Sequence, residues 1–158
     1  PYMTNERLYY FSELINLVAQ DRITLLDDVQ GKIESLTRFY DDAFRHTDCK
    51  VSPIGRAQFY ILTHEIGQTI IGYQMFAISP SNKCELFEVF VSDSFRKKGI
   101  ASNLIDSAIY FSHNHLKVEN FEYHLLKAKN SEESILISVF NRLKETYPNL
   151  SFKDKIEG

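Results

Sequence analysis

Four consecutive residues, Arg96-Lys97-Lys98-Gly99, have the types and spacing best suited to binding chemistry. They separate an alternating, Phe- and Val-rich segment at 85–91, typical of a strand, from a segment with helical spacing that begins near Gly99. A turn that opens a helix presents backbone N–H groups without intrahelical acceptors, at the positive end of the helix dipole. With three cations beside them, these groups predict a site for a phosphate-bearing ligand. The G-x-x-x-x-G-K-[ST] and G-x-G-x-x-G patterns are absent, which excludes the common nucleotide-binding loops.

Two carboxylates, Glu85 and Glu88, lie on the predicted strand that leads into this turn. A carboxylate on a mostly apolar strand is suited to accept a proton, so both are candidate general bases. Because they are three positions apart, a regular strand would point them to opposite faces, and only a bulge would bring both to one pocket. The alternative is that one or both are solvent-facing strand residues.

Hydrophobic periodicity predicts the elements that must position these residues. For residues 4–20, the alternative to a strand followed by a helix is a single helix. Residues 64–68 are expected to form a hairpin loop. The short connections between 57 and 91 predict an antiparallel meander, and the helix after it is a crossover to a parallel strand. In chain order we expect a strand near 7–11, helices at 12–20 and 31–47, strands at 57–63, 69–78 and 85–91, a helix at 99–116, a strand at 121–127, a helix from Ser131 that stops at Pro148, and a strand at 150–152.

The pattern Arg96-x-x-Gly99-x-Ala101 resembles the R/Q-x-x-G-x-G/A signature of the GCN5-related N-acetyltransferase (GNAT) family. The resemblance implies a single α/β (α+β) domain over 1–158, of order (β)ααβββαβαβ, with a mixed, mostly antiparallel sheet flanked by helices. It implies acetyl-CoA as the cosubstrate, with its pantetheine arm between two diverging parallel strands, 87–91 and 121–127. The cofactor-binding residues that it implies are Phe90, Val91, Arg96, Lys97, Lys98, Gly99, Ile100, Ala101, Ser102 and Asn130.

The same resemblance bears on catalysis. Glu85 has the spacing of the catalytic glutamate in histone-type members, and Glu88 that of an acidic residue in polyamine- and aminoglycoside-type members. The general-acid tyrosine of the family is replaced by Phe140, which has no proton to give. Water or another group would then protonate the thiolate. Tyr123, His124 and Ser138 could take the place of the tyrosine as the general acid, but no sequence feature favours any of them.

The C-terminal end also departs from the family, which normally finishes with two strands. This chain has room for one, so the terminal strand pair is shortened or a homodimer partner completes that edge of the sheet.

The function expected from these residues is transfer of an acetyl group to a primary amine of a small molecule or peptide, directly in a ternary complex. The alternatives are a weak or inactive CoA-binding module used for regulation, and an acyltransferase that uses a longer acyl-CoA. The acidic pairs Asp27-Asp28 and Asp41-Asp42 could attract a cationic amine, but a solvated helix face or cap is the favoured interpretation.

Composition limits the other partners. The chain has 158 residues, is 44% hydrophobic and carries a net charge of −3, so one domain is expected and no nucleic-acid partner. No apolar run reaches the length of a membrane span and no signal peptide is visible, so a cytoplasmic protein is expected. Cys49 and Cys84 do not make a disulfide framework, and no metal site is predicted around His113 and His115.

Overall fold

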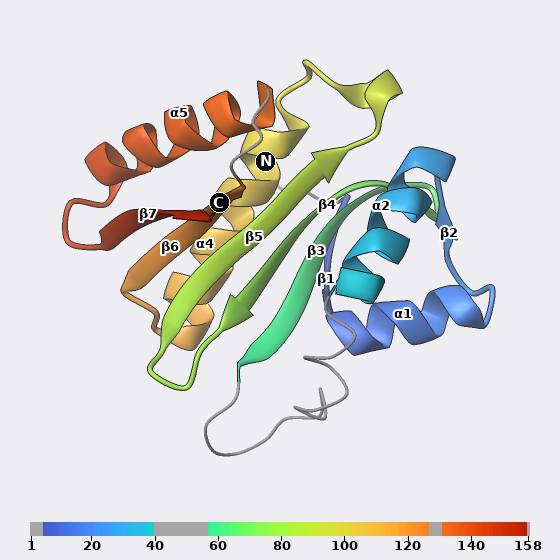
Figure 1. The fold of residues 1–158 in the computed structure, drawn as a ribbon, viewed down its shortest axis with the longest axis horizontal. Helices are drawn as coiled ribbons and strands as arrows, with labels where there is room; N and C mark the ends of the chain where they lie inside the picture. Colours follow the sequence, from blue (N-terminus) through green and yellow to red (C-terminus); the bar gives the residue numbers. More distant parts are fainter. Residues whose placement is uncertain (1–4, 40–56, 127–130, 158) are drawn as a thin grey trace.

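The computed structural model describes residues 5–39, 57–126 and 131–157. One mixed sheet of seven strands runs through this part of the chain, in the order β1-β3-β4-β5-β6-β7, and β2 pairs with β4 beside that path (Figure 1). The strands are β1 (Glu6–Tyr10), β2 (Thr24–Leu25), β3 (Gln58–Ile66), β4 (Thr69–Ile78), β5 (Lys83–Val91), β6 (Asn120–Leu126) and β7 (Ser151–Glu157). The helices are α1 (Phe11–Ala19), α2 (Asp27–Phe39), α4 (Ile100–Leu116) and α5 (Ser131–Thr146), and a 3-10 turn, η1, spans Asp93–Phe95.

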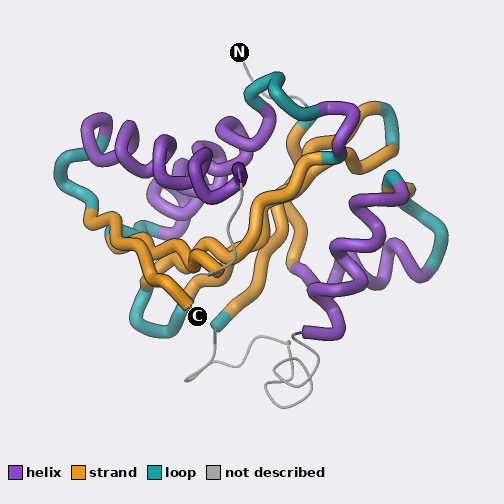
Figure 2. Tube along the Cα trace, turned by 45° about the horizontal axis from the view of Figure 1, so that its top comes forward, coloured by secondary structure: helices purple, strands orange, loops and turns teal. Residues whose placement is uncertain are grey.

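Helices cover both faces of the sheet, α4 and α5 on one face and α1 and α2 on the other (Figure 2). Each face has its own apolar core, because strand residues alternate between the faces. Phe76 and Leu86 belong to the core under α4 and α5, together with Leu104 and Ile105 of α4. The core under α1 and α2 includes Leu14, Val29, Tyr73, Met75 and Phe90. The sheet therefore carries two separately packed layers, and a residue on β5 belongs to one or the other.

The strand pairings confirm the predicted meander and crossover. β3 pairs antiparallel with β4, and β4 antiparallel with β5, while β5 and β6 are parallel. α4 makes the crossover connection between β5 and β6. The separate first strand and helix are also confirmed, as β1 and α1, against the alternative of one helix over 4–20.

Several predicted boundaries were wrong. The second helix begins at Asp27 rather than at 31, because Asp27 and Asp28 supply the acidic first turn that favours a helix start; its predicted end near 47 lies outside the described residues. The segment His64–Ile66 belongs to β3 rather than to the hairpin loop, and β5 begins at Lys83.

The last strand was predicted too short. β7 continues to Glu157, although its sequence is polar, because it pairs with β6 along its whole length, from Asn120↔Ser151 to Leu126↔Glu157. β7 is parallel to β6 and is the last strand in the order of the sheet. The single terminal strand agrees with the expected shortening of the C-terminal pair.

Within the described residues, no helix combines the length and the apolar character that crossing a lipid bilayer requires.

Candidate active site

The parallel strands β5 and β6 separate halfway along β5. Their register runs from Lys83↔Asn120 to Leu86↔Tyr123 and ends there, whereas β5 continues to Val91. β6 instead keeps its register with β7 as far as Leu126↔Glu157. The divergence that the family resemblance implied for 87–91 and 121–127 is therefore present as far as Leu126, where the described part of the second strand ends, and it opens the sheet toward the turn that follows β5.

That turn places the predicted cations at the start of a long helix. Lys97 and Lys98 are exposed, and α4 follows with 17 residues. The first intrahelical bond runs from the Asn103 N–H to the Gly99 carbonyl, 3.0 Å apart. The helix therefore offers no acceptor to the N–H groups of Ile100, Ala101 and Ser102, and no side chain caps this end. These groups can donate to a phosphate, which the dipole also favours.

Gly99 is needed for its backbone conformation. Its φ is +80°, in the left-handed region, and an added Cβ would meet nothing within 4 Å. The outer side of the turn is thus open, and a side chain here would be strained and would occupy that open space. These observations fit the phosphate groups of a CoA molecule.

Arg96 folds back onto the strand end instead of pointing only outward. Its Nε donates to the Val91 carbonyl at 2.9 Å, and its guanidinium lies 5.2 Å from the centre of the Phe90 ring. The Lys32 Nζ of α2 lies 5.4 Å from the same ring centre. Sequence reasoning missed Lys32, and its only signal was its position one helical turn after Asp28.

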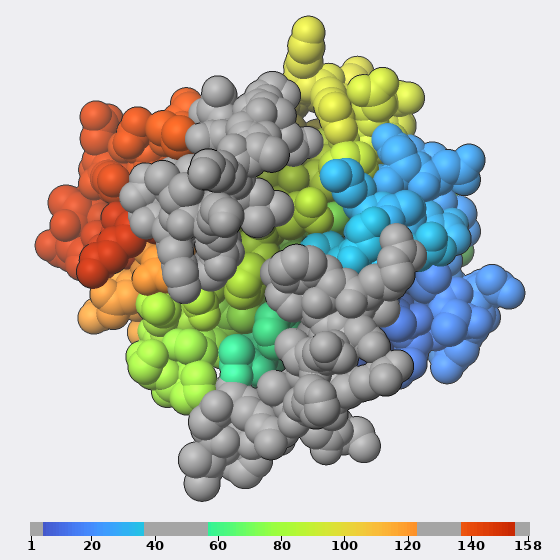
Figure 3. Space-filling model, viewed as in Figure 1, coloured from blue at the N-terminus to red at the C-terminus, as the bar shows by residue number. Residues whose placement is uncertain are grey.

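Asp28 ties α2 to the turn. Its carboxylate accepts hydrogen bonds from the Ser92 hydroxyl at 2.8 and 3.0 Å and from the Asp93 N–H at 2.9 Å. Desolvation opposes ionisation of Asp28, but the hydrogen bonds from Asp93 and Ser92 outweigh it and lower the pKa of the carboxyl. In the space-filling view, the blue atoms of the α2 region adjoin the yellow-green atoms of the turn (Figure 3). Asp28 therefore has a structural role, because it joins α2 to the turn after β5; the solvated helix face or cap that the sequence favoured did not include this contact.

Glu85 and Glu88 share one face of the sheet, because β5 contains a bulge. Met75 pairs with Glu88, whereas the next residue of β4, Phe76, pairs with Leu86, so Phe87 is the extra residue. Ala77 pairs with Glu85. Since Met75 and Ala77 are two positions apart on β4, their partners point to the same face, the one covered by α1 and α2.

Glu88 is held on this face by Tyr73, which sequence reasoning missed. The buried Tyr73 hydroxyl donates to Glu88 Oε1 at 2.6 Å. Close by on the face, the rings of Phe87 and Phe59 lie 6.1 Å apart. Glu85 pairs across the sheet with Glu122 of β6, whose carboxylate lies 3.2 Å from the Lys83 Nζ. The face thus combines half-buried carboxylates with aromatic rings.

Phe140 occupies a packed core position on α5. It is 2% exposed, and its ring lies 5.5 Å from that of Phe152 in an edge-on arrangement. Ser138 is exposed on α5. Tyr123 and His124 lie outside the residues whose side chains the structure describes, and Asn130, Asp41, Asp42 and Cys49 lie outside the described residues.

Two other kinds of chemistry receive no support. Burial raises the pKa of the Cys84 thiol to about 12, so this cysteine does not form the thiolate that a nucleophile needs. In the part of the chain that the structure describes, no three His, Cys, Asp or Glu side chains gather as metal ligands.

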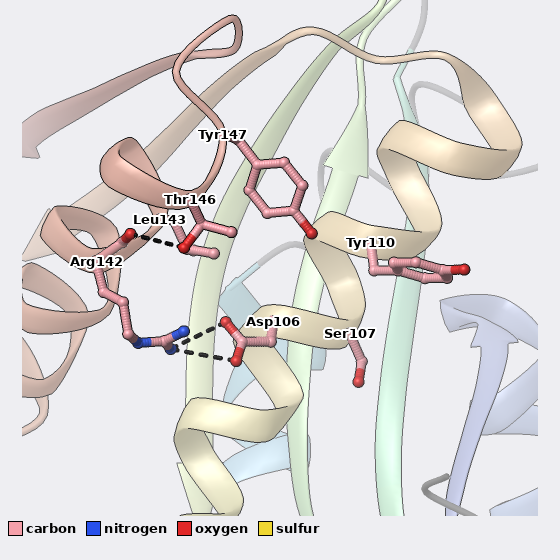
Figure 4. Close-up of a pocket in the computed structure, with 7 residues that line it drawn as sticks. All are labelled: Asp106, Ser107, Tyr110, Arg142, Leu143, Thr146 and Tyr147. Atoms are coloured by element: carbon pink, nitrogen blue, oxygen red, sulfur yellow. Dashed lines mark hydrogen bonds and ion pairs between the residues drawn. The ribbon is translucent and has the colours of Figure 1, made fainter. Parts of the chain in front are cut away.

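A hollow of about 330 Å³ lies elsewhere, between α4 and α5 (Figure 4). Arg142 of α5 reaches Asp106 of α4 across it, and its Nη2 lies 3.0 and 3.2 Å from the two carboxylate oxygens. Thr146 donates to the Arg142 carbonyl at 3.1 Å. None of the residues that line this hollow belongs to the turn or to β5, so it is separate from the candidate active site.

Residues 25–131 match the sequence profile described as the acetyltransferase (GNAT) family. A search of curated protein sequences found no match.

Solved structures with a similar fold include the aminoglycoside N-acetyltransferase AAC(6′)-Iy in complex with CoA, with a TM-score of 0.52 and 13% identity over 85% of this chain and 88% of that chain. An aminoglycoside acetyltransferase from an uncultured soil metagenomic sample has a TM-score of 0.50 and 13% identity over 89% of this chain and 86% of that chain. A ribosomal-protein-alanine N-acetyltransferase from Brucella melitensis matches over 49% of this chain, which spans 57% of that protein, with a TM-score of 0.44 and 16% identity. At these identities the likeness concerns the fold alone.

Proposed function

Since the chain belongs to the acetyltransferase (GNAT) family, we propose that it is an acetyl-CoA-dependent N-acetyltransferase acting on a primary amine of a small molecule or peptide. Transfer takes place directly, with both substrates bound together. The observation that carries this proposal is the end of the β5–β6 register at Leu86↔Tyr123, on a strand that leads straight into a cationic helix start. The gap between β5 and β6, which we call the slot, is followed along the chain by the anion site at the start of α4. This arrangement matches a ligand with a long arm that ends in phosphate groups.

The chain's own groups bind and orient this ligand. When bound, acetyl-CoA supplies the thioester whose acetyl group is transferred. The N–H groups at the start of α4 and the cations Lys97 and Lys98 hold the phosphates, and Gly99 leaves room for their approach. Arg96 acts from the strand end, where it fixes the Val91 carbonyl. The backbone of Phe90 and Val91 lines the slot beside the acetyl end.

Glu88 is the general base in this proposal. Attack requires a neutral amine, so a carboxylate must take the proton as the C–N bond forms and the C–S bond breaks. Glu88 faces the α1–α2 side, and its Oε1 is oriented by Tyr73 at 2.6 Å. Glu85 lies on the same face and is the second candidate. With Phe140 in the core, the departing thiolate takes its proton from solvent.

The acceptor is a cationic amine. Glu85, Glu88 and Glu122 occupy neighbouring positions on one face, beside the rings of Phe59 and Phe87. Carboxylates attract an ammonium group, and aromatic rings favour its approach. Aminoglycoside acetyltransferases of similar fold carry such acceptors in their names, and we extend that substrate class to this chain only as a proposal.

The second candidate function is a CoA-binding module without turnover, which is favoured by the absence of a hydroxyl at Phe140. The homodimer and the cytoplasmic location remain predictions from the sequence.

A thiol-release assay with acetyl-CoA and a panel of diamines, polyamines, aminoglycosides and a lysine-containing peptide tests the proposal. We expect turnover with at least one cationic amine, and loss of kcat in Glu88→Gln with CoA affinity retained. CoA binding without turnover on any amine would favour the regulatory module. Equal turnover of Glu88→Gln and the wild type, with Glu85→Gln inactive, would assign the base to Glu85.

A further inference from the structure

Two consecutive residues of β4, Tyr73 and Gln74, hold the same residue of β5 from opposite faces of the sheet. Neighbouring residues on a strand point to opposite sides. Tyr73 bonds to the side chain of Glu88 on the α1–α2 side, and Gln74 bonds to its backbone from the α4–α5 side. Both side chains are completely buried, at 0% exposure.

Gln74 contacts the bulge itself. Its Nε2 donates to the Glu88 carbonyl at 3.0 Å and to the Met75 carbonyl at 2.8 Å. These are the two residues that pair at the shift of register, where Phe87 is inserted. A bulge disrupts the ladder of backbone hydrogen bonds, so a side-chain donor at this point satisfies carbonyls that the disrupted ladder serves poorly.

Burying the amide of Gln74 lowers the stability of the fold, so the two hydrogen bonds that its Nε2 donates must offset this loss. Its Oε1 is buried and accepts no hydrogen bond from the described residues. An unsatisfied buried acceptor destabilises a fold, and an apolar side chain of the same length would avoid that cost. The fit of the Nε2 donors to the bulge offsets it.

The bulge decides where Glu88 points. On a regular strand without the bulge, Glu85 and Glu88 would lie on opposite faces because they are three positions apart. The carboxylate of Glu88 would then enter the apolar core under α4. The bulge and the hydroxyl of Tyr73 together determine the face and the direction of this carboxylate.

We propose that Tyr73 and Gln74 are positioning residues for Glu88: Gln74 fixes the bulge that turns Glu88 toward the acceptor, and Tyr73 orients its carboxylate. This inference rests on the proposed function, in which Glu88 accepts the proton of the amine. Neither residue touches the substrate, and each acts through Glu88.

The test compares Tyr73→Phe and Gln74→Met with matched controls. Tyr60→Phe removes a hydroxyl from the neighbouring strand, where it donates to Gln58, and Ser112→Ala removes a buried hydrogen bond to the Ala108 carbonyl. We expect kcat with the best amine of the panel to fall roughly tenfold to a hundredfold in both β4 variants, as misplacement of a reacting group does. The KM for acetyl-CoA and the affinity for CoA should stay at the wild-type value, and both controls should keep wild-type kcat.

A double-mutant cycle separates positioning from stability. In a Glu88→Gln background, Tyr73→Phe and Gln74→Met should cost little further kcat, because the group that they position is already lost. Additive losses would overturn the inference. So would wild-type kcat in both single variants when Glu88→Gln is inactive. Full activity of Glu88→Gln, by contrast, would refute the proposed base rather than the positioning of Glu88.

A measurement without turnover completes the test. In the protein without ligand, Gln74→Met should increase amide hydrogen exchange at Phe87, Glu88 and Val89, and Ser112→Ala should not. Should Gln74→Met fail to fold, Tyr73→Phe, which removes only one hydroxyl, still tests the positioning of Glu88 in the double-mutant cycle with Glu88→Gln. Unchanged exchange at the bulge in a folded Gln74→Met protein would contradict the role of Gln74.

Discussion

The Ser92 hydroxyl lies 2.8 Å from Asp28 Oδ1, and this hydrogen bond joins α2 to the turn that follows β5. The same carboxylate accepts the N–H of Asp93 at 2.9 Å. The turn that presents Lys97, Lys98 and Gly99 is thus held in place by a helix that comes more than sixty residues earlier in the chain. In the proposed enzyme, α2 therefore supports the cofactor end of the site.

Asp28→Asn should weaken CoA binding roughly threefold to tenfold, as the loss of one or two such hydrogen bonds allows. The variant also removes a negative charge near the phosphates, which alone would strengthen binding. Asp27→Asn makes the same charge change at the neighbouring exposed position, so the difference in Kd between the two variants isolates the hydrogen bonds. Calorimetry at one fixed salt concentration measures both, and equal Kd values would contradict a supporting role for Asp28.

Phe140→Tyr should not restore a general acid. The ring is 2% exposed and packs edge-on against Phe152, so the new hydroxyl would be buried in an apolar core. We expect a loss of about 1–3 kcal/mol in the free energy of unfolding. Urea denaturation and the thiol-release assay measure the two effects, with Phe140→Leu as the variant that lacks the hydroxyl. Faster thiol release by Phe140→Tyr would show that position 140 reaches the reacting groups.

Cys84 should resist alkylation in the folded protein. It is completely buried, and its pKa is raised to about 12, so the reactive thiolate is absent at pH 8.5. Iodoacetamide followed by peptide mass mapping should show an unmodified Cys84 in native buffer and a modified one in urea. Rapid native labelling of Cys84 would contradict the core under α4 as described.

Much of this fold follows from the sequence, because its patterns are local. The apolar, Ile-rich run at 69–78 and the helical spacing after Gly99 predicted β4 and α4 almost to the residue. β7 was underestimated because Lys153 and Glu157 carry no apolar signal, and only the pairing with β6 makes the segment a strand. Boundaries fixed by tertiary pairing cannot be found from local periodicity.

The candidate site was predicted in part for the same reason. The turn at Arg96–Gly99 is a local motif, and Glu85 and Glu88 were found from their strand. Their shared face depends on a register shift between β4 and β5, which no local pattern encodes. Tyr73, Gln74 and Asp28 act on residues 14 to 65 positions away, so only the fold brings them to the site.

The central claim is that the turn before α4 binds the phosphates of CoA. Calorimetric titration with CoA and acetyl-CoA tests it on the wild type, Gly99→Glu and the control Gly67→Glu, which places the same residue at a glycine of φ +65° in the β3–β4 hairpin. We predict a Kd on the order of micromolar for the wild type and for Gly67→Glu, and at least about tenfold weaker binding for Gly99→Glu. No binding by the wild type, or equal binding by Gly99→Glu and Gly67→Glu, would contradict it.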